Sequence, residues 1–178
     1  MQLVLVRHAL PELVRGGAGP ADPPLTPLGE QQAERLVAAL GVEPEIVTDL
    51  REYDADAAHY VPVHEMARLD PPAWDRMLAG LLPAHVDVPT FTARVDAALE
   101  RIVAVHPGRA TAVVVAHAGV INAWLAQLIG IARPLAFPLD YAGITRVIAG
   151  RDGRRSVRTV NEIAHVADLL SLTAQGRA

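Results

Sequence analysis

The hydrophobic pattern of the chain predicts strands of two kinds. Residues 2–6 and 111–116 are continuous apolar runs, which are typical of strands buried on both faces of a parallel sheet. Residues 143–149 and 156–160 alternate apolar with polar positions on either side of an Asp-Gly turn, which predicts a hairpin at the sheet edge. A shorter apolar stretch at 45–48 is a weaker candidate for a further strand.

Apolar residues recur at helical spacing in the segments between these strands. The predicted helices cover residues 27–40, 71–82, 92–105 and 120–129. Thr26 is expected to cap the first of them, because a proline follows it at the first helical position. Strands that alternate with helices indicate an α/β fold, a three-layer sandwich with a mostly parallel central sheet and helices on both faces.

The length of 178 residues allows one hydrophobic core, so residues 1–178 are expected to form a single domain. The last residues, about 171–178, are expected to be frayed. The N-terminal apolar run is interrupted by Arg7 and His8, which makes it too short for a signal peptide or a membrane span. We therefore expect a cytoplasmic protein with no membrane partner.

The composition narrows the possible chemistry. The chain has 16 arginines and no lysine, a formal net charge of -4, and no cysteine. Without lysine, Schiff-base catalysis and a Walker-type phosphate loop are excluded, so any bound anion must be held by arginine. Without cysteine, disulfides, thiolate zinc sites and thiol nucleophiles are excluded. An acidic chain with 4% aromatic residues is not expected to bind nucleic acid.

Polar residues follow both apolar strands at the point where each strand ends. Arg7 and His8 follow the first strand, and His117 follows the second, directly before Ala118-Gly119 and a predicted helix. Because ligands bind at the carboxyl ends of parallel strands, these side chains are expected to meet in one crevice. Arginine is a good donor to phosphate oxygens, and a neutral imidazole can attack phosphorus. The helix N-terminus favours an anion as well.

Five segments between residues 6 and 165 form an ordered set of motifs. They are 6–9 (VRHA), 25–33 (LTPLGEQQA), 50–54 (LREYD), 115–121 (VAHAGVI) and 161–165 (NEIAH). In this order they resemble the motifs of the histidine phosphatase superfamily, which has the phosphoglycerate-mutase-like fold. Ala9 stands where the family usually has glycine.

The resemblance implies a role for each of these residues. His8 is expected to attack the phosphoryl group and become a phosphohistidine, while Arg7, His117 and the helix N-terminus at Ala118 bind the phosphoryl oxygens. Glu52 is expected to protonate the leaving oxygen and then activate the water that hydrolyses the intermediate. The resemblance therefore implies a phosphatase that acts on a small phosphomonoester without a metal ion or other cofactor.

One part of the family pattern is missing from this chain. After the first helix, the family has a further strand and a helix that carries a second phosphate-binding arginine, together roughly 25 residues, most of one βαβ unit. Here the predicted first helix is followed almost directly by Pro44. The nearest candidates to replace that arginine are Arg51, Arg15 and Arg146, and none of them matches the motif.

The missing arginine leaves a second function open, a catalytically impaired protein that binds a phosphorylated ligand or acts as an interaction module. A mutase is less favoured, because Leu10 and Pro11 stand where mutases usually carry polar or aromatic residues. The missing strand is also expected to expose a sheet edge, which predicts a possible homodimer through that edge. A metal site at His59, His64 and Glu65 is not expected, since the spacing fits no metal motif.

Overall fold

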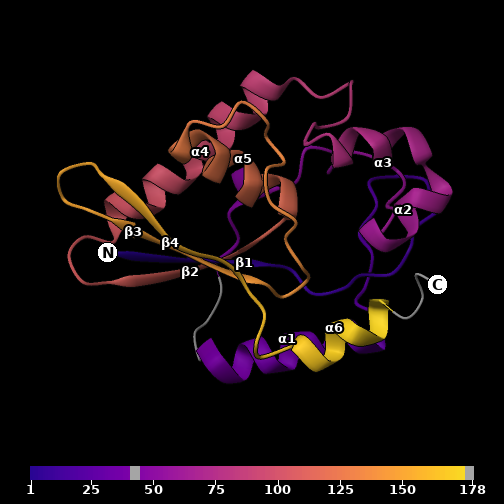
Figure 1. Cartoon of the computed structure of the whole chain (residues 1–178), viewed down its shortest axis with the longest axis horizontal. Helices are drawn as coiled ribbons and strands as arrows, with labels where there is room; N and C mark the ends of the chain where they lie inside the picture. The colour runs from indigo at the N-terminus through magenta and orange to yellow at the C-terminus, as the bar shows by residue number, and fades with distance from the viewer. Residues whose placement is uncertain (41–44, 175–178) are drawn as a thin grey trace.

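The computed structural model describes residues 1–40 and 45–174 (Figure 1). The strands are β1 (Gln2–Arg7), β2 (Thr111–Ala116), β3 (Ile144–Ala149) and β4 (Arg155–Glu162). The helices are α1 (Pro27–Leu40), α2 (Val63–Leu69), α3 (Pro71–Leu78), α4 (Val88–Val105), α5 (Ala118–Ile129) and α6 (Ala167–Ala174), and a 3-10 turn, η1, spans Thr48–Leu50. Within these residues, no helix is both long and apolar enough to cross a membrane.

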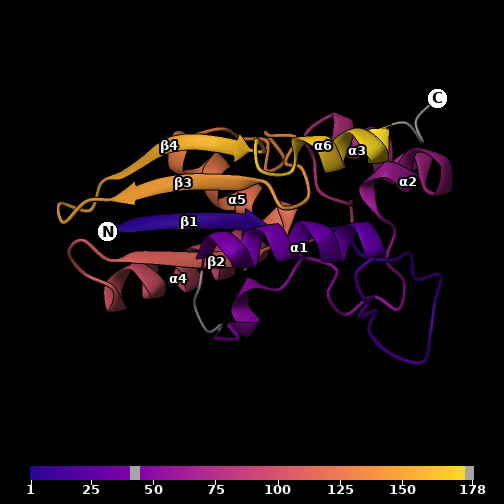
Figure 2. The same ribbon diagram turned by 90° about the horizontal axis from the view of Figure 1, so that it is seen from below.

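The strands form one sheet in the order β2-β1-β3-β4. β1 and β2 are parallel, and β3 is antiparallel to both β1 and β4. Among the described strands, β1, β2 and β4 therefore run in one direction and β3 runs in the opposite direction. A tight hairpin joins β3 to β4. The helices α1 and α6 lie on one face, and α4 and α5 lie on the other (Figures 1 and 2). The predicted α/β sandwich is confirmed.

Strand β1 is the centre of the hydrophobic core. Leu3 and Leu5 point to the face covered by α4 and α5, where they pack in the larger apolar cluster. Val4 and Val6 point to the opposite face and pack in a second cluster with residues of α1 and α6. All four side chains are buried, which confirms the prediction that this apolar run is covered on both faces.

Several helices begin or end differently from the sequence prediction. α4 begins at Val88, four residues before the predicted start, because Asp87 caps it by accepting a hydrogen bond from the Thr90 N–H at 3.2 Å. α3 ends at Leu78, four residues before the predicted end at residue 82, and α5 begins at Ala118, two residues before its predicted start. Residues 171–174 continue α6, a helix that was not predicted, and fraying of the C-terminal end stays a prediction. This helix is held against the sheet by buried Val166 and Leu169. Residues 175–178 lie outside the described part of the chain.

The predicted strand at 45–48 is also wrong. Residues 45–47 have no regular structure, and η1 follows them directly. The Ile46 side chain is 92% exposed, so this short apolar stretch has no sheet face to pack against. The helix α2 was not predicted, since its seven residues bury no side chain fully and its N-terminus has no side-chain cap.

Strand β2 lies at the edge of the described sheet, as the missing segment predicts. The Ala110 and Ala116 carbonyls accept hydrogen bonds from the β1 side, so the backbone groups of Thr111, Val113 and Val115 point away from β1. The Val115 side chain is 60% exposed. The chain between α1 and η1 is too short to hold a further strand and helix. Pairing of this edge with a second copy stays a prediction.

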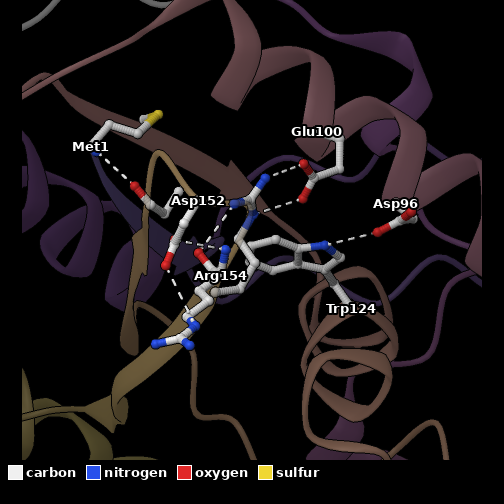
Figure 3. A network of polar contacts seen from close by, with 8 residues as sticks. Met1, Asp96, Glu100, Trp124, Asp152 and Arg154 are labelled. Carbon is white, nitrogen blue, oxygen red and sulfur yellow. Dashed lines mark hydrogen bonds and ion pairs between the residues drawn. The ribbon is translucent and has the colours of Figure 1, made fainter.

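Polar contacts join α4 to α5, which covers the same face of the sheet, and to the hairpin of β3 and β4 (Figure 3). The Trp124 Nε1 on α5 donates to Asp96 Oδ1 on α4 at 3.2 Å. Glu100, one turn further along α4, accepts hydrogen bonds from the Arg155 guanidinium at the start of β4. These contacts fix the orientation of α4 and α5 over the sheet.

The N-terminus of α1 holds the loop that follows β1. The Thr26 hydroxyl accepts from the Gly29 N–H at 2.9 Å, which confirms it as the cap, and donates to the Leu10 carbonyl at 3.1 Å. The fully buried Gln32 accepts from the Leu10 N–H at 3.0 Å. Helix and loop approach so closely that a Cβ at position 29 would lie 2.1 Å from the Leu10 oxygen.

This close approach predicts that Gly29→Ala destabilises the protein by about 1–3 kcal/mol, because the added methyl group must displace backbone atoms. Gly17→Ala is the matched control, since a Cβ at position 17 would meet no atom within 4 Å. The free energy of unfolding, measured with urea, should fall for the first variant and stay within about 0.5 kcal/mol for the second. Equal stabilities of the two variants would contradict the packing described here.

Candidate active site

The register of β1 and β2 brings the two predicted histidines together. Arg7, the last residue of β1, is paired with Ala116, the last residue of β2. His8 and His117 are the next residues on these parallel strands, so they leave the sheet side by side. Their ring centroids are 4.9 Å apart at an interplanar angle of 62°. Arg7, His8 and His117 therefore meet at the ends of the two strands, as the sequence predicted.

Arg7 is held in a fixed position behind the two rings. Its side chain is only 5% exposed, and its Nη1 donates a hydrogen bond to the Leu139 carbonyl. The guanidinium carbon lies 3.7 Å from the centroid of the Tyr141 ring, which allows a cation–π contact. The Tyr141 ring is also 5.7 Å from the His8 ring. Tyr141 therefore fixes both residues, although the sequence analysis did not single it out.

The protonation state of His8 follows from its surroundings. A carbonyl oxygen can only accept, so the contact of 2.8 Å between His8 Nδ1 and the Ala9 oxygen places the ring proton on Nδ1. The lone pair of the neutral ring is then on Nε2. Burial of the ring, together with the charges of Arg7 and His117, lowers the pKa of His8 to about 3. At neutral pH the ring is therefore uncharged and nucleophilic.

His117 is also neutral at physiological pH. Burial of its ring, together with the positive charges of Arg7 and Arg94, lowers the pKa of His117 to about 4. The residue precedes α5 with extended backbone angles, and its carbonyl accepts from the Ile121 N–H in the first helical turn. The ring is thus placed at the N-terminal end of α5, next to His8.

Glu52 lies at the same helix end, far from these residues in sequence. Its Oε2 accepts from the Gly119 N–H at 2.9 Å, and its Oε1 accepts from the Tyr53 N–H at 3.1 Å. Removal of the carboxyl group from water, together with the negative charge of Asp54, raises the pKa of Glu52 to about 7. The hydrogen bonds from the Gly119 and Tyr53 N–H groups and the positive charge of Arg7 limit this rise in pKa, because they favour the ionised carboxylate. Glu52 is therefore a carboxyl group that gains and loses a proton near neutral pH.

The helix N-terminus is partly occupied by this carboxyl group. A Cβ at position 119 would lie 2.3 Å from Glu52 Oε1, so only glycine leaves room for the contact. The expectation that the N–H groups at this end are free for phosphate is corrected at Gly119, whose N–H is bound to Glu52. Ala118, the predicted phosphate-binding position, lines the cavity beside the two histidines.

The segment that carries Glu52 is held in place by Arg94 on α4. The Arg94 guanidinium donates to the Asp49 carbonyl at 2.6 Å and to the Arg51 carbonyl at 3.0 Å. It thus fixes the backbone immediately before Glu52 and places a positive charge near His117. The helical pattern around Arg94 gave no indication of this role, because its partners are backbone oxygens about 45 residues away.

The predicted residues surround one cavity of about 520 Å³. Arg7, His8, Glu52, His117 and Ala118 all line it. In the described part of the chain, Arg7 is the only arginine among the lining residues.

The three arginines considered as replacements lie elsewhere. Arg51 forms an ion pair with Asp56 at 3.5 Å, and Arg146 pairs with Glu162 across β3 and β4 at 3.0 Å. Arg15 is exposed and does not line the cavity. None of the three therefore supplies a second guanidinium to the cavity. No group of three or more histidine or carboxylate side chains in residues 1–40 and 45–174 is arranged to hold a metal ion.

Comparison with solved structures supports the fold. A phosphoserine phosphatase variant from Entamoeba histolytica, in complex with phosphoserine, is 18% identical with a TM-score of 0.68, and the match covers 93% of this chain and 98% of that one. The α-ribazole phosphatase from Shigella flexneri is 20% identical with a TM-score of 0.62, covering 91% and 96%. A phosphoglycerate mutase from Bacillus anthracis is 17% identical with a TM-score of 0.70, covering 96% of each chain.

No curated protein matches the chain in sequence. The family model of the histidine phosphatase superfamily (branch 1) matches residues 35–162, which is more than half of the chain. That match includes Glu52, His117 and Ala118, and the paired register of the first two strands adds Arg7 and His8 to the same site. The chain therefore belongs to the histidine phosphatase superfamily.

Proposed function

We propose that this protein is a metal-independent phosphatase that hydrolyses a small phosphomonoester through a phosphohistidine on His8. The observation that carries the proposal is the pair of neutral imidazoles, His8 and His117, in contact beside the buried Arg7 and a protonatable Glu52. Two solved structures of the same fold are named as phosphatases, of phosphoserine and of α-ribazole phosphate, which supports hydrolysis over other reactions of the superfamily.

In the first step, the His8 Nε2 lone pair attacks phosphorus, and the bond between phosphorus and the ester oxygen breaks. The Nδ1–H bond to the Ala9 carbonyl keeps the lone pair on Nε2 and stabilises the positive charge that the ring acquires. Arg7 and His117 donate hydrogen bonds to the phosphoryl oxygens as negative charge is redistributed. Protonated Glu52 gives its proton to the leaving oxygen, so that a neutral alcohol departs.

In the second step, the same groups work in the opposite sense. The Glu52 carboxylate left by the first step takes a proton from a water molecule, and the water oxygen attacks the phosphoryl group. The P–N bond breaks, which returns His8 to the neutral state and releases inorganic phosphate. A pKa of about 7 suits both steps, because Glu52 must donate a proton in one and accept a proton in the other.

We expect His8→Ala to reduce phosphatase activity by at least about a thousandfold, because it removes the nucleophile. His106→Ala is the matched control, since His106 caps the far end of α4 by bonding the Ile102 carbonyl and does not line the cavity. The measurement is hydrolysis of 4-nitrophenyl phosphate in the presence of a chelator. Similar rates for wild type and His8→Ala would contradict the proposal.

We also expect the pH dependence of kcat/KM to report Glu52. Because burial raises the pKa of Glu52 to about 7, the acid is protonated below pH 7 and is lost as the pH rises through that value. For an alkyl phosphate, kcat/KM should therefore fall about tenfold per pH unit well above pH 7. In Glu52→Gln this decrease should disappear, and the rate below pH 7 should fall by about 100-fold.

For 4-nitrophenyl phosphate, whose leaving group needs no proton, the loss in kcat/KM on Glu52→Gln should be much smaller. Ionisation of the substrate affects the pH profiles of wild type and Glu52→Gln equally. A difference between the two profiles therefore reports the ionisation of Glu52. If wild type and Glu52→Gln had the same pH profile with the alkyl phosphate, Glu52 would not be the general acid.

A second function is favoured by the single arginine in the cavity. If Arg7, the one arginine among the described lining residues, alone binds the phosphoryl group, transition-state stabilisation is weaker than two guanidinium groups would provide. The chain would then serve as a phosphate-binding module with little turnover. Calorimetric titration with orthovanadate, together with turnover measurements, distinguishes the two functions. Tight binding without hydrolysis supports the module, and rapid hydrolysis excludes it.

A further inference from the structure

The cavity extends beyond Arg7 and His8 into a region that the proposed chemistry does not use. We call this the distal region; it is lined by the loop at 20–25, the loop at 53–62, the helices α2 and α3, and Leu135. These helices lie beyond the carboxyl end of β1 (Figure 1), in line with the site. In a phosphatase of this geometry, the distal region receives the part of the substrate that leaves with the ester oxygen.

The wall of the distal region is largely apolar. The side chains that form it include Leu25, Tyr60, Val63, Met66, Met77 and Leu135. Tyr60 and Val63 are tied to the core, because the Tyr60 hydroxyl lies 3.4 Å from the Tyr141 hydroxyl and the Val63 N–H donates to the latter at 3.3 Å. Apolar walls of this kind bind apolar groups by removing their surface from water.

The charges in the distal region are mainly negative. Asp54 lines the cavity and is partly removed from water, and Asp22 lines it nearer the surface. His59 is the only basic side chain that this region adds in the described part of the chain, and no arginine besides Arg7 lines the cavity there. A carboxylate on the leaving group would therefore meet like charge without a guanidinium partner.

We propose that this site selects phosphomonoesters of bulky, apolar alcohols or phenols that carry no negative charge. The inference rests on the proposed phosphatase function and specifies its substrate class. The site thus discriminates against substrates whose leaving group carries a carboxylate.

The dimensions of the cavity agree with this class. A volume of about 520 Å³ is far larger than a phosphoryl group needs and lies in the range of sites for drug-sized molecules. The two methionines, Met66 and Met77, are flexible and polarizable, and they come from two successive helices. Such side chains adapt to apolar ligands of different shape.

The test compares phenyl phosphate with 3-carboxyphenyl phosphate, whose phenols have nearly the same acidity and therefore the same chemical reactivity. We expect kcat/KM to be at least about tenfold lower for the carboxylated substrate. We expect 2-naphthyl phosphate to be hydrolysed at least as efficiently as phenyl phosphate, because the larger ring fills more of the apolar wall. Equal or better hydrolysis of the carboxylated ester would overturn the inference.

Two matched variants assign the selectivity to the distal region. Met66→Arg introduces a cation into the wall and should reduce the discrimination against the carboxylate by about tenfold or more. Leu78→Arg adds the same charge on α3, where Leu78 is 67% exposed and does not line the cavity, and should leave the discrimination unchanged. The same change in both variants would mean that general charge, not the wall of the cavity, sets the selectivity.

A binding measurement separates this inference from the proposed function. Phenylphosphonate and 3-carboxyphenylphosphonate cannot be hydrolysed, and their dissociation constants follow from calorimetric titration of the wild-type protein. If neither phosphate ester is turned over but phenylphosphonate binds at least about tenfold more tightly than 3-carboxyphenylphosphonate, the phosphatase function fails and the chemistry assigned to the cavity stands. If both phosphonates bind equally, the inference fails whatever the turnover.

Discussion

The in-register pairing of β1 with β2 is the constraint on which the site depends. Both strands end at the same level, so their next residues, His8 and His117, must leave the sheet as neighbours. Burial of β1 between two apolar clusters fixes the register of this strand with its neighbours, since a shift of one residue would turn each buried side chain to the other face of the sheet. The packing of the core therefore sets the distance between the two rings.

A single buried charge then determines the electrostatics of the site. Arg7 lies against Tyr141 and beside both imidazoles, and burial together with this charge keeps the rings neutral. Burial has the opposite consequence for Glu52, because it disfavours the ionised carboxylate and brings the pKa to about 7. The same buried environment thus favours a neutral imidazole with a free Nε2 lone pair at His8 and a carboxyl group that can hold a proton at Glu52. Among the described residues that line the cavity, Arg7 is the one guanidinium beside the two imidazoles.

The sequence predicted most of the sheet and the residues of the site, because these depend on local patterns. Continuous apolar runs end at Val6 and at Ala116, and a histidine follows each of them in the next one or two positions. Tyr141 and Arg94 could not be found in this way. Tyr141 stands in a turn before β3, and Arg94 binds backbone oxygens of a distant segment, so no periodicity marks either residue.

The wrong strand and the helix that was not predicted have a related cause. An apolar stretch such as 45–48 becomes a strand only when a neighbouring strand is available, and a terminal helix such as α6 forms when a core is there to receive Val166 and Leu169. Both outcomes depend on tertiary packing, which a short window of sequence does not contain. The distal region has the same origin, because its wall combines three separate parts of the chain, residues 20–25, residues 53–77 and Leu135.

The central claim is that His8 carries the phosphoryl group between the two chemical steps. Rapid acid-free quenching during turnover, followed by peptide mass spectrometry, tests it most directly. The account predicts a transient, acid-labile phosphoryl group on the peptide that contains His8 and assigns it to that ring. Hydrolysis that proceeds with no phosphorylated peptide, or with the phosphoryl group on another residue, would contradict it.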